Sequence, residues 1–399
     1  MAVTMPILVL PETSPILEKR VGLSPACLQV EYLPNKYSQS PKTKDRSALR
    51  RRAGPRRYRV ISLAMLFVAS MLPASMLIAH ASAAPSGKYF DHVVTILMEN
   101  NDLPSVLAQG PYQAGLANQY TLSKGYSGVS HPSEPNYAAM ISGQIGVNQN
   151  DGLCCGQDNH QNIVDNLESH GLTWKAFAED LTTGDCTGGG IDTDHFPFLY
   201  FSDITSSSSR CGNLVGATAS GDQEVIDALN ASGNWPNYVW LTPNVSNDAH
   251  GTSIGFGDSY LAGIVPKILA STVFKTQRAA LFIVYDEGND VSCSSGGPDC
   301  VYASWSGPTA KKGFTSNTAY THYSYLHTIE DNWGLPTLAS DDGGAPVMSE
   351  FFTGNSGSSF GGALQWLPVL LIIAAVVVAA VLISVKILPA SKRRRQRGS

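Results

Sequence analysis

Two pairs of oxygen-bearing residues each follow an apolar segment with the composition of a buried strand. Glu99-Asn100 comes directly after residues 92–98, and Asp286-Glu287 comes directly after residues 279–285. Short apolar runs rich in β-branched and aromatic residues are typical of strands buried in a sheet. In an open α/β sheet, ligands bind at the carboxyl edge of the strands, where both pairs would lie. Carboxylate and amide oxygens suit hard divalent cations, so the two pairs predict a metal site.

Two further segments that we expect to be strands, 173–177 and 238–241, also lead into polar residues. Those residues are Glu179, Asp180, Asn244, Asp248 and His250. A single polar strand end would fit capping by water equally well. Several polar strand ends that converge on one edge favour a binding site instead. A histidine among oxygen ligands widens the choice of cation to zinc, iron or manganese.

The segment His-Pro-Ser-Glu-Pro-Asn-Tyr at residues 131–137 holds a candidate nucleophile. Pro135 can occupy the first turn of a helix, where its missing N–H costs nothing. Ser133 would then lie just ahead of that helix, where the dipole and free N–H groups favour an anion. An ordinary helix cap is the alternative reading of this serine. Beside a metal, its hydroxyl could ionise and attack a phosphoryl group, with His131 close enough to contact the phosphate or leaving group.

A last histidine, His322, precedes residues 323–332, which we expect to form the final helix. At the start of that helix its ring could point into the site. A structural role fits a lone histidine at a helix start equally well. His327 lies further along the same helix, and we expect it to be structural.

Strand-like and helical segments alternate through residues 85–362. The expected helices are 106–119, 162–170, 222–230, 260–270 and 323–332. This rhythm predicts an α/β fold with a mostly parallel sheet covered by helices on both faces. We expect residues 85–352 to form one domain and the Gly- and Ser-rich residues 353–365 to form a linker.

Charge is unevenly distributed along the 399 residues. Residues 1–59 carry 12 basic and 4 acidic residues and are expected to be disordered, whereas residues 85–362 carry a net charge of −19. Residues 60–84 have the basic start, apolar run and small-residue end of a signal peptide, and an uncleaved signal anchor remains an alternative. Residues 366–388 contain 19 consecutive uncharged residues, enough to span a bilayer, and the basic tail 389–399 follows. We therefore predict terminal membrane helices, a cell-membrane location, an extracytoplasmic domain and a cytoplasmic C-terminus.

Six of the seven cysteines lie in the part expected to be exported. An even number in an oxidising compartment predicts disulfide bonds. Cys293 and Cys300 are expected to close a local loop. The remaining four can pair in three ways, and the neighbours Cys154 and Cys155 are not expected to pair with each other.

The ordered set of motifs resembles the phosphoesterase family, which includes acid phosphatases and bacterial phospholipases C and belongs to the alkaline phosphatase superfamily. The resemblance covers about residues 90–335. Its segments are 96–100, 131–137, 247–250, 257–261, 284–288 and 322–324.

The resemblance implies an alkaline-phosphatase-like fold, a serine nucleophile and a divalent cation of unknown identity. The implied cation ligands are Glu99, Asn100, Ser133, Asp286 and Glu287. His250 and His322 would contact phosphate or protonate the leaving group, and we assign Asn136 and Asp248 to substrate binding. The sequence departs from the family pattern in the acidic residues before His195, so no role is assigned to that histidine. It departs again at Asn101-Asp102, where substrate contacts are expected to differ.

These observations predict a metal-dependent phosphoric ester hydrolase that forms a phosphoseryl intermediate, with phosphate monoesters as substrates. A phospholipase C-like phosphodiesterase is the nearest alternative, because the expected anchor would place the site near lipid. A sulfatase is disfavoured because Ser133-Glu134-Pro135-Asn136 lacks the arginine of a sulfatase motif. A non-catalytic surface protein on the same fold is the alternative from another class. The partners expected are a phosphate ester and the membrane, with no nucleic acid.

Overall fold

The computed structural model describes residues 85–354, apart from 147–149, 153 and 218–220. An eight-stranded sheet with the order β5-β4-β6-β1-β7-β8-β2-β9 forms its centre. The strands of this sheet are β1 (His92–Met98), β2 (Thr121–Ser123), β4 (Trp174–Glu179), β5 (Leu214–Ala217), β6 (Tyr238–Thr242), β7 (Ala279–Tyr285), β8 (Ala303–Ser306) and β9 (Phe314–Ser316). A two-stranded parallel ribbon joins β3 (Tyr126–Ser127) to β10 (Tyr320–Thr321).

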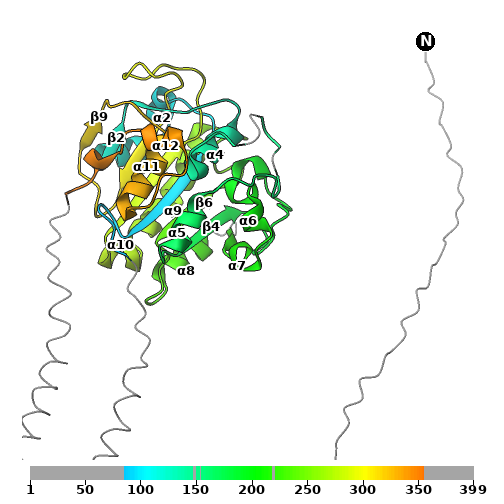
Figure 1. Cartoon of the computed structure of the whole chain (residues 1–399). Helices are drawn as coiled ribbons and strands as arrows, with labels where there is room; N and C mark the ends of the chain where they lie inside the picture. The colour runs from blue at the N-terminus through cyan, green and yellow to red at the C-terminus, as the bar shows by residue number, and fades with distance from the viewer. Residues whose placement is uncertain (1–84, 147–149, 153, 218–220, 355–399) are drawn as a thin grey trace, which may run out of the picture. The chain divides into compact units, whose positions relative to one another are not determined.

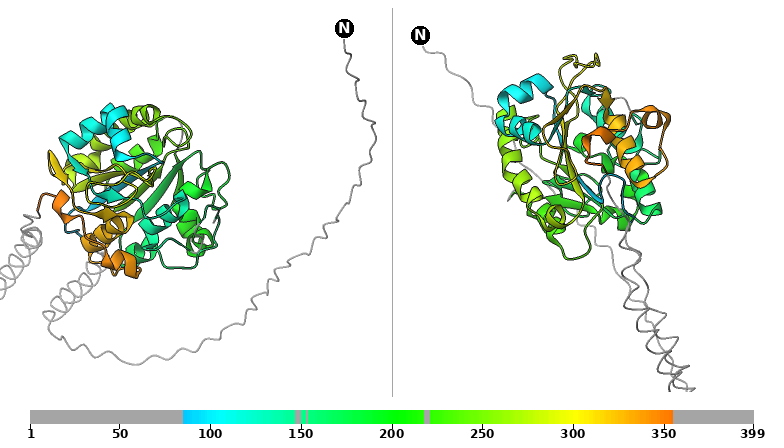
Figure 2. Two further views of the ribbon diagram at one scale, coloured as in Figure 1. Left: turned by 90° about the horizontal axis from the view of Figure 1, so that it is seen from above. Right: turned by 90° about the vertical axis from the view of Figure 1, so that its left-hand side faces the viewer.

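Eleven α-helices surround the strands in the described residues. They are α2 (Leu103–Gln109), α3 (Pro111–Gln119), α4 (Ser133–Ser142), α5 (Ile163–Ser169), α6 (Ser202–Thr205), α7 (Ser208–Cys211), α8 (Gln223–Asn230), α9 (Ile254–Leu269), α10 (Thr272–Thr276), α11 (His322–Trp333) and α12 (Ser340–Gly344). Viewed along the sheet, α2, α3 and α9 lie on one side and α11 and α12 on the other (Figures 1 and 2). Three short 3₁₀ turns, Thr193–His195, Pro197–Leu199 and Ser349–Phe351, complete the described elements.

The central strand β1 determines which residues meet at the sheet edge. It pairs in parallel with β6 on one side and with β7 on the other, and Met98 lies opposite Tyr285. Only the pairings of β8 with β7 and with β2 are antiparallel among the described ladders. Every residue of β1 and β7 is buried, as expected for strands covered on both faces. The predicted α/β class with a mostly parallel sheet is confirmed.

The expected elements differ from the observed ones mainly at helices. The predicted helix 106–119 is two helices, because Gly110 ends α2 and Pro111 begins α3. Helix α9 begins at Ile254, where the Ser253 side chain caps it, rather than at residue 260. No helix among the described residues is long and apolar enough to cross a membrane. The predicted membrane segments 60–84 and 366–388 lie outside the described residues.

Three disulfide bonds join the six cysteines of the domain. Cys293–Cys300 closes a local loop as predicted, and Cys186 pairs with Cys211. The expectation about Cys154 and Cys155 was wrong, because these neighbours form a disulfide with each other. The peptide bond between them is cis, and their Cα atoms lie 3.0 Å apart.

A buried pair of carboxyl groups, Glu330 and Asp342, lies between α11 and α12. The N–H of Leu338 donates to Glu330 Oε1 (3.1 Å) and to Asp342 Oδ2 (2.8 Å). Burial, reinforced by the negative charge of Asp342, raises the pKa of Glu330 to about 10 from its ordinary 4.5. Glu330 is therefore protonated in the folded protein at neutral pH.

Replacing Glu330 with glutamine should flatten the pH dependence of stability. A carboxyl whose pKa is raised on folding stabilises fully below pH 4.5 and loses that contribution as the pH rises towards 10. Between pH 5 and 8, the wild type should lose on the order of 4 kcal/mol more unfolding free energy than E330Q. Urea titrations at both pH values measure this difference.

Glu350→Gln is the matched control, because the pKa of Glu350 is lowered: burial opposes the shift, but the hydroxyls of Ser316 and Tyr320 outweigh it. E350Q should not reproduce the flattening. Equal slopes for the wild type and E330Q would contradict a protonated Glu330.

Candidate active site

The ends of β1 and β7 place Glu99 and Asp286 side by side. The N–H of Asp286 donates to the carbonyl of Met98 (3.0 Å), which continues the strand pairing into the site. The N–H of Asn100 then donates to Asp286 Oδ1 (2.9 Å). Asn100 adopts a φ of 47°, in the left-handed region that asparagine tolerates better than most residues. Of the two pairs found in the sequence, Glu99, Asn100 and Asp286 therefore lie together at the sheet edge.

Ser133 is the first residue of α4 and faces this pair. Its Oγ lies 3.2 Å from Glu99 Oε2 and 3.3 Å from Asn100 Oδ1. The N–H of Glu134 is already used by Asp151 Oδ1 (3.2 Å), and Pro135 has none. The start of α4 therefore offers an oxyanion fewer donors than the sequence suggested, although it places the serine hydroxyl against carboxylates.

The side chain of Asn100 tests whether a cation fits here. Its Oδ1 faces only acceptors; if the amide is turned over, its nitrogen instead donates to Glu99 Oε2 (2.8 Å) and Asp286 Oδ1 (3.0 Å). The Asn100 side chain therefore either donates an amide N–H to these two carboxylates or, through its oxygen, shares a bound cation with them. Glu99, Asn100, Ser133 and Asp286 supply the oxygen ligands that divalent cations take. The donor set fits a bound divalent cation.

The pKa values of Glu99 and Asp286 are both raised in this site. Burial raises the pKa of Glu99 well above its ordinary value, and the charge of Asp286 adds to the shift. Burial also raises the pKa of Asp286 to about 6, against hydrogen bonds from the Asn100 N–H and the Ser133 hydroxyl. Buried like charges of this kind need a compensating positive charge.

His195 and His250 approach Glu99 from the side of β6. His195 Nε2 lies 3.4 Å from Glu99 Oε2, and His250 Nδ1 lies 3.3 Å from the same oxygen. Asp248 is buried between them: its Oδ2 lies 3.5 Å from His195 Nδ1, and its Oδ1 accepts from the His250 N–H (2.7 Å). Glu99, His195 and His250 also have ligand atoms close enough together to hold a metal ion.

Sequence reasoning assigned no role to His195, yet it lies in the centre of the site. Burial lowers the pKa of His195, but the negative charges around it, that of Glu99 foremost, outweigh burial and raise the pKa to about 9. The acidic segment 192–194 directly before His195 could have indicated this role, but we interpreted it as a departure from the family pattern. Its ring stacks on Tyr137 of α4, a contact that no local motif encodes.

Glu287 points away from Glu99 towards the loop before α4. Its Oε2 accepts from Asn136 Nδ2 (3.2 Å) and contacts His131 Nδ1 (2.9 Å). Asn136 also accepts from the N–H groups of Val129 (2.8 Å) and Ser130 (3.1 Å), so its amide holds this loop. The structure therefore joins Glu287, Asn136 and His131 into a second group beside the first.

His322 lies behind the site, fully buried. Its Nε2 bonds the carbonyl oxygen of Asp286 (2.5 Å) and its Nδ1 bonds the Tyr126 hydroxyl (3.1 Å). Burial lowers the pKa of His322 to about 4, so the ring is neutral near neutral pH. In this arrangement it supports the Asp286 backbone rather than facing the Ser133 hydroxyl.

Glu179 serves the loop that carries Asp248 and His250. Both of its oxygens accept from Asn247 Nδ2 (2.9 and 2.7 Å), and Oε2 also accepts from the Asn244 N–H (2.9 Å). The loop is thereby tied to the end of β4. A small cleft lined by Glu179, His195 and Asn244, among others, opens beside the site.

A model of the phosphoesterase family matches residues 107–336, more than half of the chain, so the chain belongs to this family. The family predicted from the sequence is confirmed. A phosphate-repressible acid phosphatase of Penicillium chrysogenum is 29% identical over 274 residues, which cover 66% of this chain and 63% of that relative. The chain thus matches somewhat less than two thirds of that protein's length.

Two further proteins are similar to this chain over different lengths and to different degrees. A phosphatidylinositol-3-phosphatase of Mycobacterium tuberculosis (strain ATCC 25618 / H37Rv) is 29% identical over 275 residues, covering 67% of this chain and 84% of the relative. A solved structure of an alkaline phosphatase superfamily protein from Vibrio parahaemolyticus aligns with a TM-score of 0.45 and 13% identity, over 64% of this chain and 71% of that chain.

Replacing Tyr137 with phenylalanine should weaken cation binding. The Tyr137 hydroxyl donates to Glu99 Oε1, and this bond fixes the orientation of a carboxylate that would hold the ion. Loss of such a supporting bond typically costs about 10–100-fold in metal affinity. Titration of the chelator-treated protein with Mn²⁺ measures the change.

Tyr302→Phe is the matched control, because this buried hydroxyl donates to the Gln113 carbonyl (3.0 Å), a contact outside the site. Y302F should keep wild-type affinity. Unchanged Mn²⁺ affinity in a folded Y137F protein would contradict a role for Glu99 in cation binding.

Proposed function

We propose that this chain is a metal-dependent phosphoric ester hydrolase that acts on phosphate monoesters through a phosphoseryl intermediate. The observation that carries the proposal is the position of Ser133 Oγ, which shares the site with Glu99, Asn100 and Asp286 at the start of a helix. A nucleophilic hydroxyl inside a cluster of cation ligands is the arrangement that phosphoryl transfer requires.

Glu99, Asn100, Ser133 and Asp286 would hold the cation. When bound, the ion would favour the ionised serine and offset the negative charge that develops on the phosphoryl oxygens. Glu287 lies next in sequence to Asp286 and remains a candidate fifth ligand, although its Oε2 contacts Asn136 and His131.

The residues of the chain would carry the remaining steps. Ser133 Oγ attacks phosphorus, its proton passes to Glu99 Oε2 at 3.2 Å, and the bond from phosphorus to the leaving oxygen breaks. His250, half exposed beside Glu99, is placed to protonate that oxygen. Water then attacks the phosphoserine and releases phosphate and the serine hydroxyl. His195, buried against Glu99 and Asp248, would hold positive charge close to the transferred group.

We favour phosphate monoesters over diesters as the substrate class for two reasons. Both relatives described above are named as phosphatases. The net charge of −19 over residues 85–362 also opposes approach to an anionic lipid surface. A phospholipase C-like diesterase remains the second candidate, supported by the apolar segment 366–388 that would hold the domain near lipid.

We also propose an extracytoplasmic location for the domain. The apolar segments 60–84 and 366–388 suggest export and anchoring, and the three disulfide bonds fit an oxidising compartment. Fractionation of expressing cells, followed by protease treatment of intact cells, tests this arrangement.

Ser133→Ala should reduce turnover of a chromogenic phosphate monoester by about a thousandfold or more, because the covalent route is lost. Acid quenching of the wild type during turnover should trap phosphate on Ser133. Ser142→Ala is the matched control: Ser142 lies at the other end of α4, where its Oγ donates to the Ala138 carbonyl (2.8 Å). Near-normal turnover by a folded S133A protein would exclude this nucleophile.

Chelation should abolish activity, and a divalent cation should restore it. The restoring ion identifies the metal, because zinc, manganese, magnesium and calcium differ in their preference for the mixture of oxygen and imidazole ligands here. Turnover that is indifferent to exhaustive chelation, with the metal content confirmed to be near zero, would remove the cation from the proposal.

Parallel assays with a monoester and a diester of the same chromogenic alcohol separate the two substrate classes. We expect kcat/KM for the monoester to be at least about tenfold higher, a difference of roughly 1.4 kcal/mol in transition-state stabilisation. The reverse order would favour the phospholipase C-like candidate.

A further inference from the structure

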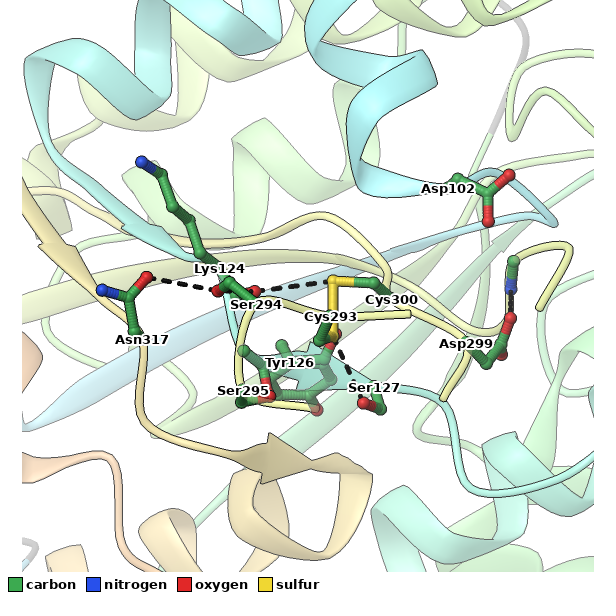
Figure 3. The surroundings of a disulfide bond; sticks show 12 residues. Asp102, Lys124, Tyr126, Ser127, Cys293, Ser294, Ser295, Asp299, Cys300 and Asn317 are labelled. Carbon is green, nitrogen blue, oxygen red and sulfur yellow. Dashed lines mark hydrogen bonds between the residues drawn. A yellow bond between two sulfur atoms is a disulfide. The ribbon is translucent and has the colours of Figure 1, made fainter. Parts of the chain in front are cut away.

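The loop between β7 and β8 carries a carboxylate that the proposed reaction does not use. Asp299 is 5% exposed, and its Oδ1 accepts from the N–H groups of Gly288 (2.8 Å) and Asp290 (3.2 Å). Its Oδ2 is buried and has no hydrogen-bond partner among the described residues. The neighbouring disulfide Cys293–Cys300 closes this part of the loop, as Figure 3 shows.

A buried carboxylate oxygen without a donor is costly, so its surroundings matter. Position 128 is a glycine, and a Cβ there would lie 2.5 Å from Asp299 Oδ2 and 3.0 Å from the Asp286 carbonyl oxygen. The missing side chain keeps the space next to Oδ2 open. Asp102, which precedes α2, also holds this loop in place, because its Oδ1 accepts from the Asn289 N–H (2.9 Å).

His131 faces the same space. Its Nε2 lies 3.5 Å from Asp290 Oδ1 and 3.7 Å from Asp299 Oδ2, while its Nδ1 lies 2.9 Å from Glu287 Oε2. A proton on Nδ1 would satisfy the contact with Glu287 Oε2 and leave the Nε2 lone pair directed at the two aspartates. A carboxylate behind the ring and a free nitrogen in front is the usual arrangement of a histidine that ligates a metal.

We propose that His131, Asp290 and Asp299 form a second divalent-cation site, distinct from the cluster around Ser133. Their ligand atoms lie within 4.8 Å of one another. A tetrahedral ion with bonds of about 2.0–2.1 Å separates its ligands by roughly 3.3 Å, close to the observed spacings around His131. One imidazole and two carboxylates suit a cation of the Zn²⁺ or Mn²⁺ type, with water in the remaining positions.

The site has an entry path and a structural consequence. The Asp290 side chain is 85% exposed, so an ion can enter from solvent and keep water ligands on that side. A bound ion would join the loop after Asp286 to the segment just ahead of Ser133. It would therefore fix the two halves of the active site relative to each other without contacting the reacting phosphorus.

Cation stoichiometry tests the proposal on the full chain. Chelator-treated protein is equilibrated with Zn²⁺ by dialysis, and bound metal is measured by elemental analysis. The wild type should bind two ions per chain, Asp290→Asn combined with Asp299→Asn should bind one, and Glu99→Gln should keep the ion at His131. Asparagine at position 299 retains an Oδ1 acceptor for Gly288 and Asp290, so the loop keeps its main-chain bonds.

Asp227→Asn is the control and should leave two ions bound, because Asp227 is an exposed aspartate on α8 whose side chain accepts from Gln223 Nε2 (2.7 Å), away from both clusters. Asp290→Asn alone, at an exposed side chain, should weaken the second ion at least about tenfold without affecting the fold. The proposal is overturned if the double variant binds as many ions as the wild type, whether that number is one or two. A single ion that the wild type binds and the double variant loses would instead assign that ion to His131, Asp290 and Asp299 and count against the cluster around Ser133. Neither depends on turnover, so failure here is distinct from failure of the proposed phosphatase activity.

Discussion

The parallel pairing of β1 with β7 is the constraint on which the site depends. It aligns Met98 with Tyr285, so the residues that follow, Glu99 and Asp286, must emerge at the same edge of the sheet. A shift of one residue in that register would turn one of the two side chains to the opposite face. Because both strands are buried along their whole length, the register is held by core packing rather than by the site itself.

That alignment brings like charges together in a buried place, and much of the surrounding structure offsets the cost. His195 lies against Glu99 and Asp248. The Tyr137 hydroxyl donates to the Glu99 carboxylate, and the Asn100 N–H donates to the Asp286 carboxylate. Their raised pKa values show that these contacts compensate only in part. Residual negative charge of this kind favours a bound cation, which is the physical basis of the proposed metal site.

Sequence patterns predicted the parts of this arrangement that are encoded locally. Apolar runs located β1 and β7, and the Ser133 segment showed a helix start, because both signals lie within a few neighbouring residues. The role of His195 was missed because its contacts come from α4 and from β6, far away in sequence. The pairing of Cys154 with Cys155 was missed for a different reason: adjacent cysteines rarely pair, and nothing in the composition of the segment marks the exception. The strands β8 and β9 were not predicted, because each is too short for an alternation of apolar and polar residues to be recognised.

The same reasoning separates the two acidic residues that the sequence presented as one pair. Asp286 ends its strand facing Ser133, and Glu287, on the alternate face, reaches Asn136 and His131. One strand end therefore contributes to two groups of polar side chains, one around Ser133 and one that includes Asn136 and His131. Asn136 and Ser133 belong to the same first turn of α4, so the two groups are joined by a single turn of helix. The strand end thus ties the position of Ser133 to the loop that follows Asp286.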